Sequence, residues 1–93
     1  MIQSFACKQT QAIFERNRST LLTVALRRVA YRKLLMLDAA AELADLRVPP
    51  GNRLESLKGD RKGQHSIRID DRWRVCFVWR AGNARAVEIV DYH

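Results

Sequence analysis

Two neighbouring stretches decide the fold: LKGDRKGQHSIRI at residues 57–69 and WRVCFVW at residues 73–79. The first is a charged loop between glycines that leads into a short alternating segment, and the second alternates along its whole length. Because successive strand side chains point to opposite faces, Val75 and Phe77 share one face with the two tryptophans, and Arg74 lies on the other. The pattern predicts paired strands with one face in the core and a guanidinium on the opposite face.

The second half of the chain is predicted to consist of strands joined by short turns. The predicted strands span residues 53–56, 65–69, 73–80 and 85–90. DDR at residues 70–72 and AGN at residues 81–83 are typical of hairpin connections. Short connections indicate antiparallel neighbours, so we expect a small, mostly antiparallel sheet of about four to five strands.

The first half is predicted to be helical after a short N-terminal strand at residues 2–5. Apolar residues cluster on one arc of residues 8–16, and residues 22–37 carry a longer apolar stripe with a three- or four-residue period. Residues 38–46 indicate a short third helical turn. RVPPGN at residues 47–52 ends it, because tandem prolines cannot continue a helix.

The predicted elements form one α+β domain that spans residues 1–93. Each helix is apolar on one stripe only, so both helices are expected to bury their stripes on one face of the sheet. The opposite face is then expected to be free to carry function.

Composition favours a polyanionic partner. The 17 Lys and Arg residues against 10 Asp and Glu residues give a formal net charge of +7, and the arginine-rich excess extends through both halves, which favours nucleic acid over a membrane surface. No apolar run approaches the roughly 20 residues needed to span a bilayer, and the N-terminus lacks a signal-peptide pattern, so we expect a cytoplasmic protein.

Neither a metal site nor a cofactor is expected from the sequence. Cys7 and Cys76 lie far apart with no second pair, which indicates neither a metal knuckle nor a disulfide framework. No carboxylate cluster suited to magnesium and no glycine-rich phosphate loop is present in the pattern.

The titratable side chains of the second half suit metal-free RNA cleavage, in which the ribose 2′-hydroxyl attacks its own phosphate. That reaction needs a base, a proton donor for the leaving oxygen, and cations for the charge that builds on phosphorus oxygens. His93 and Glu55 are candidates for proton transfer, and Lys58 with Arg74 for the cations. The alternative is structural, with Lys58 as a solvated loop charge and Arg74 in a cross-strand salt bridge to Glu88.

Several motifs together resemble the HigB-type toxins of bacterial toxin–antitoxin modules, within the wider RelE and ParE superfamily. They are MIQSF at 1–5, KLLMLDAA at 33–40, PGNRL at 50–54, LKGDRKG at 57–63, SIRI at 66–69, WRVCF at 73–77 and the closing DYH at 91–93. The resemblance covers nearly the whole chain and implies a RelE-like fold, with an N-terminal strand and two helices on one face of a small sheet. It also implies an mRNA interferase, a ribosome-dependent and metal-independent endoribonuclease that inhibits translation by cleaving message in the A site.

The same resemblance implies the partners. They are the ribosome with its mRNA and a HigA-type antitoxin with a helix-turn-helix domain, which represses the shared operon. Operator DNA is then contacted only through the antitoxin complex.

Carried over by position, the family's phosphate-binding and catalytic cations correspond to Lys58 and Arg74, and its terminal acid–base residues to Asp91, Tyr92 and His93. The chain departs from the family at Glu55, where a histidine is common, and at His65, where an aromatic residue is common.

These departures leave the identity of the general base open. There are two alternatives. In the first, Glu55 is the base itself, since a carboxylate is ionised at neutral pH. In the second, Glu55 is only a salt-bridge partner of Lys58, and His93 transfers the proton. The second assignment is favoured slightly, because an imidazole exchanges protons near neutral pH.

Seven further cations are predicted to contact RNA or the ribosome. They are Arg27, Arg28, Arg32, Lys33, Arg61, Lys62 and Arg68. For the four on the longer predicted helix, an ordinary solvated surface or a docking face for an acidic partner is the alternative.

Two other functions remain open at this level. The first is a ParE-like inhibitor of gyrase, which acts by protein contact and generally lacks the closing Tyr-His pair that this chain has. The second is a plain RNA-binding or ribosome-binding module, in which the cations only follow phosphates and binding weakens steeply with salt.

Overall fold

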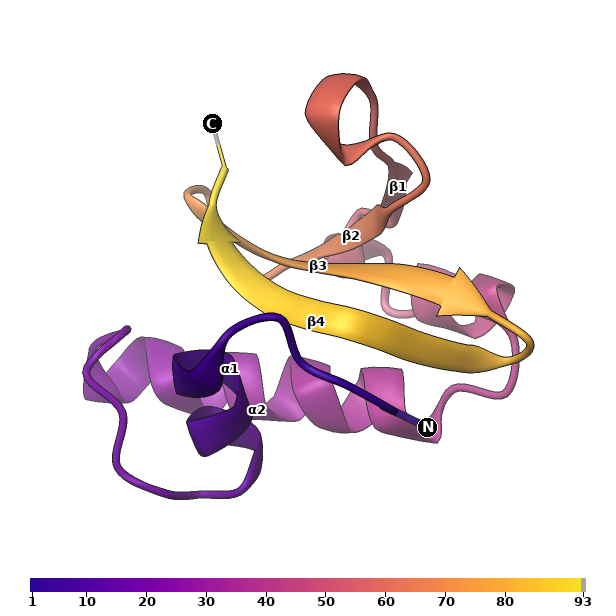
Figure 1. Cartoon of the computed structure of the whole chain (residues 1–93). Helices are drawn as coiled ribbons and strands as arrows, with labels where there is room; N and C mark the ends of the chain where they lie inside the picture. Colours follow the sequence, from indigo (N-terminus) through magenta and orange to yellow (C-terminus); the bar gives the residue numbers. More distant parts are fainter. Residues whose placement is uncertain (93) are drawn as a thin grey trace.

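The computed structural model describes residues 1–92, which form two helices and a four-stranded sheet (Figure 1). The elements in chain order are α1 (Lys8–Phe14), α2 (Val24–Ala39), the short 3-10 helices η1 (Leu43–Arg47) and η2 (Pro50–Asn52), β1 (Glu55–Ser56), the 3-10 helix η3 (Gly59–Arg61), β2 (His65–Arg68), β3 (Trp73–Arg80) and β4 (Asn83–Asp91). The strand order is β1-β2-β3-β4, and every neighbouring pair is antiparallel. Both α-helices lie on one face of the sheet, which confirms the predicted α+β architecture.

The N-terminal segment follows the edge of β4 in the parallel direction. Two isolated bridges join them, Ile2 to Ala84 and Phe5 to Val87. Between these bridges, Ala86 has a φ of 50° and its N–H bonds to the Ser4 hydroxyl at 2.9 Å, so the ladder is interrupted. The predicted strand at residues 2–5 is therefore an extended segment with two contacts to the sheet rather than a continuous strand.

Both predicted helices are present with shifted ends. The last turn of α1 closes on Ala12, whose carbonyl accepts a 2.8 Å bond from the N–H of Asn17 after Arg16 has taken a left-handed φ of 60°. This 6→1 bond is the Schellman type of helix end. Thr23 caps α2 by accepting a 3.3 Å bond from the Leu26 N–H, so the helix begins at Val24 rather than at residue 22.

The core lies between the helices and the sheet. Ala30, Leu34 and Leu37 of α2 are fully buried against Val75 and Phe77 of β3, and each large apolar side chain contributes roughly 1.5–3 kcal/mol by leaving water. The two tryptophans of β3 pack against the same cluster. The face predicted to be core is therefore confirmed.

The opposite face of the sheet, called the outer face below, is only partly free. The segment from β1 to β2 folds over it and buries Leu57 and Cys76, which lie outside the main core cluster. Arg61 fastens this segment to β4 through a 2.8 Å ion pair with Glu88, and that hydrogen bond raises the pKa of Arg61. The open part of the outer face is therefore the end of the sheet that carries Arg74.

Among residues 1–92, no helix is both long enough and apolar enough to cross a membrane.

Candidate functional site

An open cleft of about 420 Å³ lies at the uncovered end of the outer face. Its lining residues come from the ends of all four strands and the β2–β3 turn: Arg53, Glu55, Arg68, Asp70, Asp71, Arg74 and Tyr92. The antiparallel register explains their meeting, because Arg68 stands directly opposite Arg74 and β4 ends beside the start of β3. Side chains directly opposite on paired strands share a face.

Arg74 is the fixed centre of this cleft. Its side chain is nearly buried, with 8% of the residue exposed. The Nε–H donates a 2.7 Å bond to the Ser66 hydroxyl, and Nη2 donates a 2.6 Å bond to the Arg53 carbonyl. A guanidinium has five N–H donors, so further donors of the held group remain for an anion in the cleft.

Glu55 faces the same guanidinium from β1. Its carboxylate Oε1 lies 3.8 Å from Arg74 Nη2, and its side chain is 52% exposed. At that separation the pair attracts without a short hydrogen bond. A phosphate entering the cleft can therefore reach Arg74 while the carboxylate stays beside it.

The turn between β2 and β3 forms one wall of the cleft. Asp70 accepts bonds from the backbone N–H groups of Arg72 and Trp73 at 2.9 and 2.7 Å, which fixes the turn. Arg68 pairs with Asp71 across the same turn. These contacts hold the wall in place while leaving its side chains at the cleft.

Tyr92, just beyond the end of β4, lines the cleft beside this turn. Its backbone N–H donates a 2.8 Å bond to the Arg72 carbonyl, and its ring is exposed enough to contact a ligand. The structure thus places Tyr92 in one cleft with three other predicted residues, Arg74, Glu55 and Arg68.

Two predicted catalytic residues lie elsewhere, and a third is not described. Lys58 is exposed at the start of η3 and does not line the cleft. Asp91 stands opposite Trp73, so its side chain points to the face of the sheet that the helices cover. There it accepts a 2.7 Å bond from Arg72 Nε, and this bond raises the pKa of Arg72. His93 lies outside the described residues.

The structural alternative for Arg74 is wrong in its partner. Glu88 forms its ion pair with Arg61 rather than with Arg74, because the β1–β2 segment brings Arg61 over the outer face. Arg74 instead points toward the strand ends and faces Glu55. The alternative pairing of Glu55 with Lys58 is likewise not the one that the structure shows.

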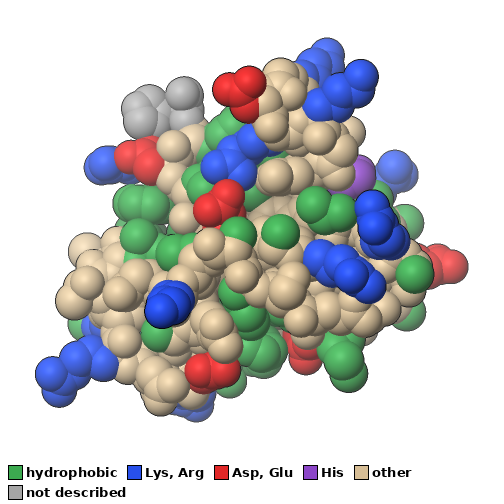
Figure 2. All heavy atoms as spheres, in the orientation of Figure 1, with side chains coloured by type: hydrophobic (Ala, Val, Ile, Leu, Met, Phe, Trp, Pro, Cys, Tyr) green, Lys and Arg blue, Asp and Glu red, His purple; other side chains and the backbone are tan. Residues whose placement is uncertain are grey.

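The four helix cations do not share one face. Arg27 donates to the Ser19 carbonyl, and Lys33 donates a 2.5 Å bond to Asn52, with burial and the neighbouring Arg32 lowering the pKa of Lys33. Arg28 and Arg32 are exposed on the solvent side of α2. Figure 2 shows cations spread over both layers, with one group at the projecting tip between β1 and β2.

The sequence did not predict the two residues that accept hydrogen bonds from Arg74. Ser66 precedes Arg68 by two positions in β2, so strand alternation places it on the face of Arg74 and a closer use of that pattern identifies it. Arg53 contributes its carbonyl from a left-handed conformation with φ 45°. No sequence pattern predicts this left-handed conformation. Within residues 1–92, no three His, Cys, Asp or Glu side chains come together as ligands for a metal ion.

Comparisons with known proteins agree on one family. Residues 3–93 match the family described as "RelE-like toxin of type II toxin-antitoxin system HigB". The chain is 40% identical to Toxin HigB-1 of Vibrio cholerae serotype O1 over 85 residues, which cover 90% of each protein. It is 32% identical to Endoribonuclease HigB of Proteus vulgaris over 97 residues, which cover both proteins completely.

Solved structures share the fold at low identity. YafQ from E. coli strain BL21(DE3) matches with a TM-score of 0.58 and 10% identity, over 98% of this chain and 93% of that one. The heterotetrameric YoeB–YefM toxin–antitoxin complex from Staphylococcus aureus gives a TM-score of 0.57 and 15% identity, over 100% of this chain and 98% of the matched one.

Proposed function

This chain belongs to the HigB family of RelE-like toxins of type II toxin–antitoxin systems, and on that premise we propose that it is an endoribonuclease that cleaves mRNA in the ribosomal A site. An antitoxin is its partner by membership of such a system. A relative that matches it end to end is named an endoribonuclease. The observation that carries the activity is the held guanidinium of Arg74 in an open cleft.

In the proposed reaction, Arg74 binds the scissile phosphate. Its two bonds to Ser66 and to the Arg53 carbonyl fix the plane of the guanidinium before substrate arrives. Donors fixed in advance stabilise the charge that develops in a transition state without reorganising. The 2′-hydroxyl oxygen attacks phosphorus, the bond to the 5′-oxygen breaks, and a 2′,3′-cyclic phosphate forms, a route that requires no metal.

The proposal gives the proton transfers to Glu55 and His93. Glu55 takes the proton of the 2′-hydroxyl, since its carboxylate lies beside Arg74 and is half exposed to substrate. His93, which follows Tyr92 in the chain, gives a proton to the leaving 5′-oxygen. The Tyr92 ring is proposed to stack on a neighbouring base of the message.

The remaining predicted residues take supporting roles in this proposal. Lys58 and Lys62, exposed at the projecting tip, and Arg32 on α2 contact ribosomal RNA, because none of the three has an ion pair within residues 1–92. Asp91 fixes the end of β4 through Arg72. Arg61 holds the β1–β2 segment against Glu88.

The ribosome orients the message, and the antitoxin is of the HigA type with a helix-turn-helix domain.

Mapping of 5′ ends tests the proposed activity. Purified protein is added to ribosomes that carry a defined message and to the same message alone. We expect new ends within the A-site codon on the ribosome and little cutting of free RNA. Message that is bound but stays intact would show a binding module instead. Induction of DNA damage in cells that express the protein, with intact message, would show a ParE-like toxin.

A further inference from the structure

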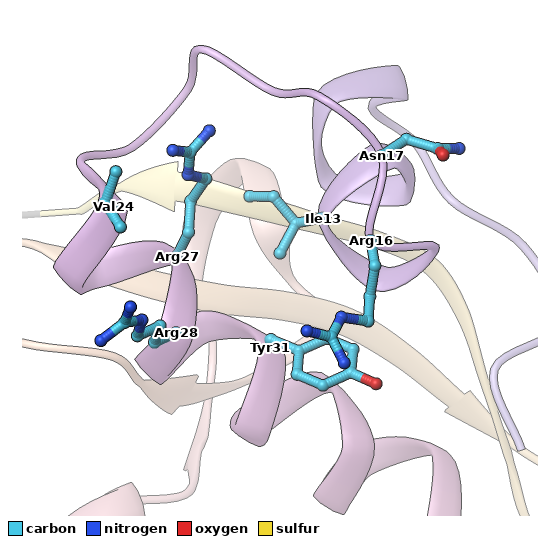
Figure 3. Close-up of a pocket in the computed structure, with 7 residues that line it drawn as sticks. All are labelled: Ile13, Arg16, Asn17, Val24, Arg27, Arg28 and Tyr31. Atoms are coloured by element: carbon cyan, nitrogen blue, oxygen red, sulfur yellow. The ribbon is translucent and has the colours of Figure 1, made fainter.

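A second pocket lies in the helical layer, between the end of α1 and the first half of α2 (Figure 3). Its volume is about 210 Å³. The lining combines an apolar floor with a cationic rim: Ile13, Val24, Tyr31, Arg16, Arg27, Arg28 and Asn17. None of these residues lines the cleft around Arg74.

Two of the rim guanidiniums are held in place by their own chain. Arg16 lies over the ring of Tyr31, with its guanidinium carbon 5.2 Å from the ring centre, and Figure 3 shows the two side chains stacked. Arg27 donates to the Ser19 carbonyl. Such fixed guanidiniums lose little side-chain entropy when they bind an anion.

The positive charge of the rim is not compensated inside the described part of the chain. No ion pair joins Arg16, Arg27 or Arg28 to an acidic group of residues 1–92, and no acidic side chain lines the pocket. A partner that brings carboxylates into reach would gain charge-assisted hydrogen bonds to groups that are already in place.

The apolar part of the pocket lining includes the exposed Val24, and the exposed Leu35 lies further along the same side of α2. Val24 is 58% exposed and Leu35 is 42% exposed, and both lie on one helical stripe with Arg28 and Tyr31, at spacings of four, seven and eleven residues. These exposed apolar side chains beside the rim cations distinguish the pocket from a purely electrostatic surface.

An apolar floor with a cationic rim fits a protein segment better than RNA. In RNA the phosphates contact cations and the bases stack on aromatic rings or guanidiniums, which leaves the aliphatic Val24 and Leu35 without a contact. A second copy of this chain, with its own net charge of +7, would bring cations to cations. An amphipathic segment that carries Asp or Glu beside apolar side chains matches both features.

We propose that this pocket is a docking site for an acidic amphipathic segment of the antitoxin. One apolar side chain of that segment enters between Ile13, Val24 and Tyr31, and its carboxylates bind the rim guanidiniums. This assigns Arg27 and Arg28, which the sequence grouped with RNA-binding cations, to a protein partner. The proposal rests on membership of a type II toxin–antitoxin family and not on the cleavage reaction.

Charge reversal tests the docking site with purified cognate antitoxin and titration calorimetry. In the variant with Arg16→Glu and Arg28→Glu, we expect affinity to fall by roughly tenfold or more, because charges across the interface then repel. Val24→Gln, at an exposed position, is expected to weaken binding without a change of charge. The matched control is Arg32→Glu on the same helix, which does not line the pocket and should bind the antitoxin as the unmodified protein does.

Cleavage of message on ribosomes separates the two possible occupants. The Arg16→Glu and Arg28→Glu variant should cleave within about twofold of the unmodified rate, whereas Arg32→Glu should cleave more slowly through its proposed ribosome contact. Unchanged antitoxin affinity in the pocket variants overturns the proposal, and a loss of cleavage with unchanged affinity assigns the pocket to RNA. Failure of the unmodified protein to cleave would contradict the proposed function and leave the binding experiment fully interpretable.

Discussion

The carboxylate of Glu55 lies 3.8 Å from the guanidinium of Arg74, across the open end of the outer face. Arg74 is nearly buried and bonded to Ser66, whereas the Glu55 side chain is half exposed. The cation of this pair is therefore fixed and the anion is free to move. That asymmetry suits a site in which the cation holds a phosphate and the carboxylate exchanges a proton.

Replacement of Arg74 should abolish most cleavage. Arg74→Lys keeps a positive charge but cannot bond to Ser66, the Arg53 carbonyl and a phosphate in the same fork geometry. We expect the single-turnover rate on ribosomes to fall about 100-fold or more, in line with loss of a preorganised donor. The matched control is Arg80→Lys at the exposed far end of β3. A rate near that of the unmodified protein would show that Arg74 does not bind the reacting phosphate.

Ser66 should act as a positioning residue for Arg74. Ser66→Ala leaves the Nε–H of a nearly buried guanidinium without its 2.7 Å acceptor, which costs about 1–3 kcal/mol of stability. We expect a lower cleavage rate with little change in ribosome binding, together with that loss in urea unfolding. Ser56→Ala, exposed on β1, is the control. Equal cleavage by both variants would leave Ser66 with a purely structural role.

Cys76 should be protected from alkylation. Burial raises the pKa of its thiol above the ordinary value of 9.0, and only the thiolate reacts. Iodoacetamide at pH 8 should therefore modify the more accessible Cys7 and spare Cys76 in the folded protein, as measured by mass spectrometry. Because folding raises this pKa, the thiol's contribution to stability is present below pH 9 and is lost as pH rises through the folded value. Cys76→Ala should remove that part of the alkaline destabilisation, and Cys7→Ala should keep it.

Periodicity accounts for how much of the fold the sequence could predict. The strand at residues 73–80 has the predicted bounds, and the stripe through Leu34 and Leu37 is buried as expected. At about 100° per residue, Arg28 and Arg32 lie within about 40° of each other around α2, whereas Arg27 and Lys33 lie about 100° from the nearer member of that pair, one on each side. The split of the basic face was therefore predictable, although the four cations were grouped together.

The partners of charged residues could not be predicted, because they depend on how the chain returns over the sheet. Glu88 pairs with Arg61, 27 residues away, once the β1–β2 segment covers the outer face. Arg53, which follows η2, adopts a left-handed conformation, and its carbonyl accepts a hydrogen bond from Arg74. Alternation placed Arg74 on the correct face, and only the three-dimensional structure showed which groups hold it there.

Glu55 and His93 can be separated as the base of the reaction by matched substitutions. Glu55→Gln keeps the size of the side chain and removes its charge. Because the pair with Arg74 is long and half exposed, little stability should be lost. We expect cleavage on ribosomes to fall by about 10²–10⁴-fold, the usual contribution of a positioned general base.

Glu55→His supplies another group that accepts a proton and should retain much more activity than Glu55→Gln. Asp60→Asn, an exposed acid in η3, controls for the loss of one negative charge near the message. If Glu55→Gln cleaves at the unmodified rate while His93→Gln does not, the base is His93, and the carboxylate beside Arg74 only balances its charge.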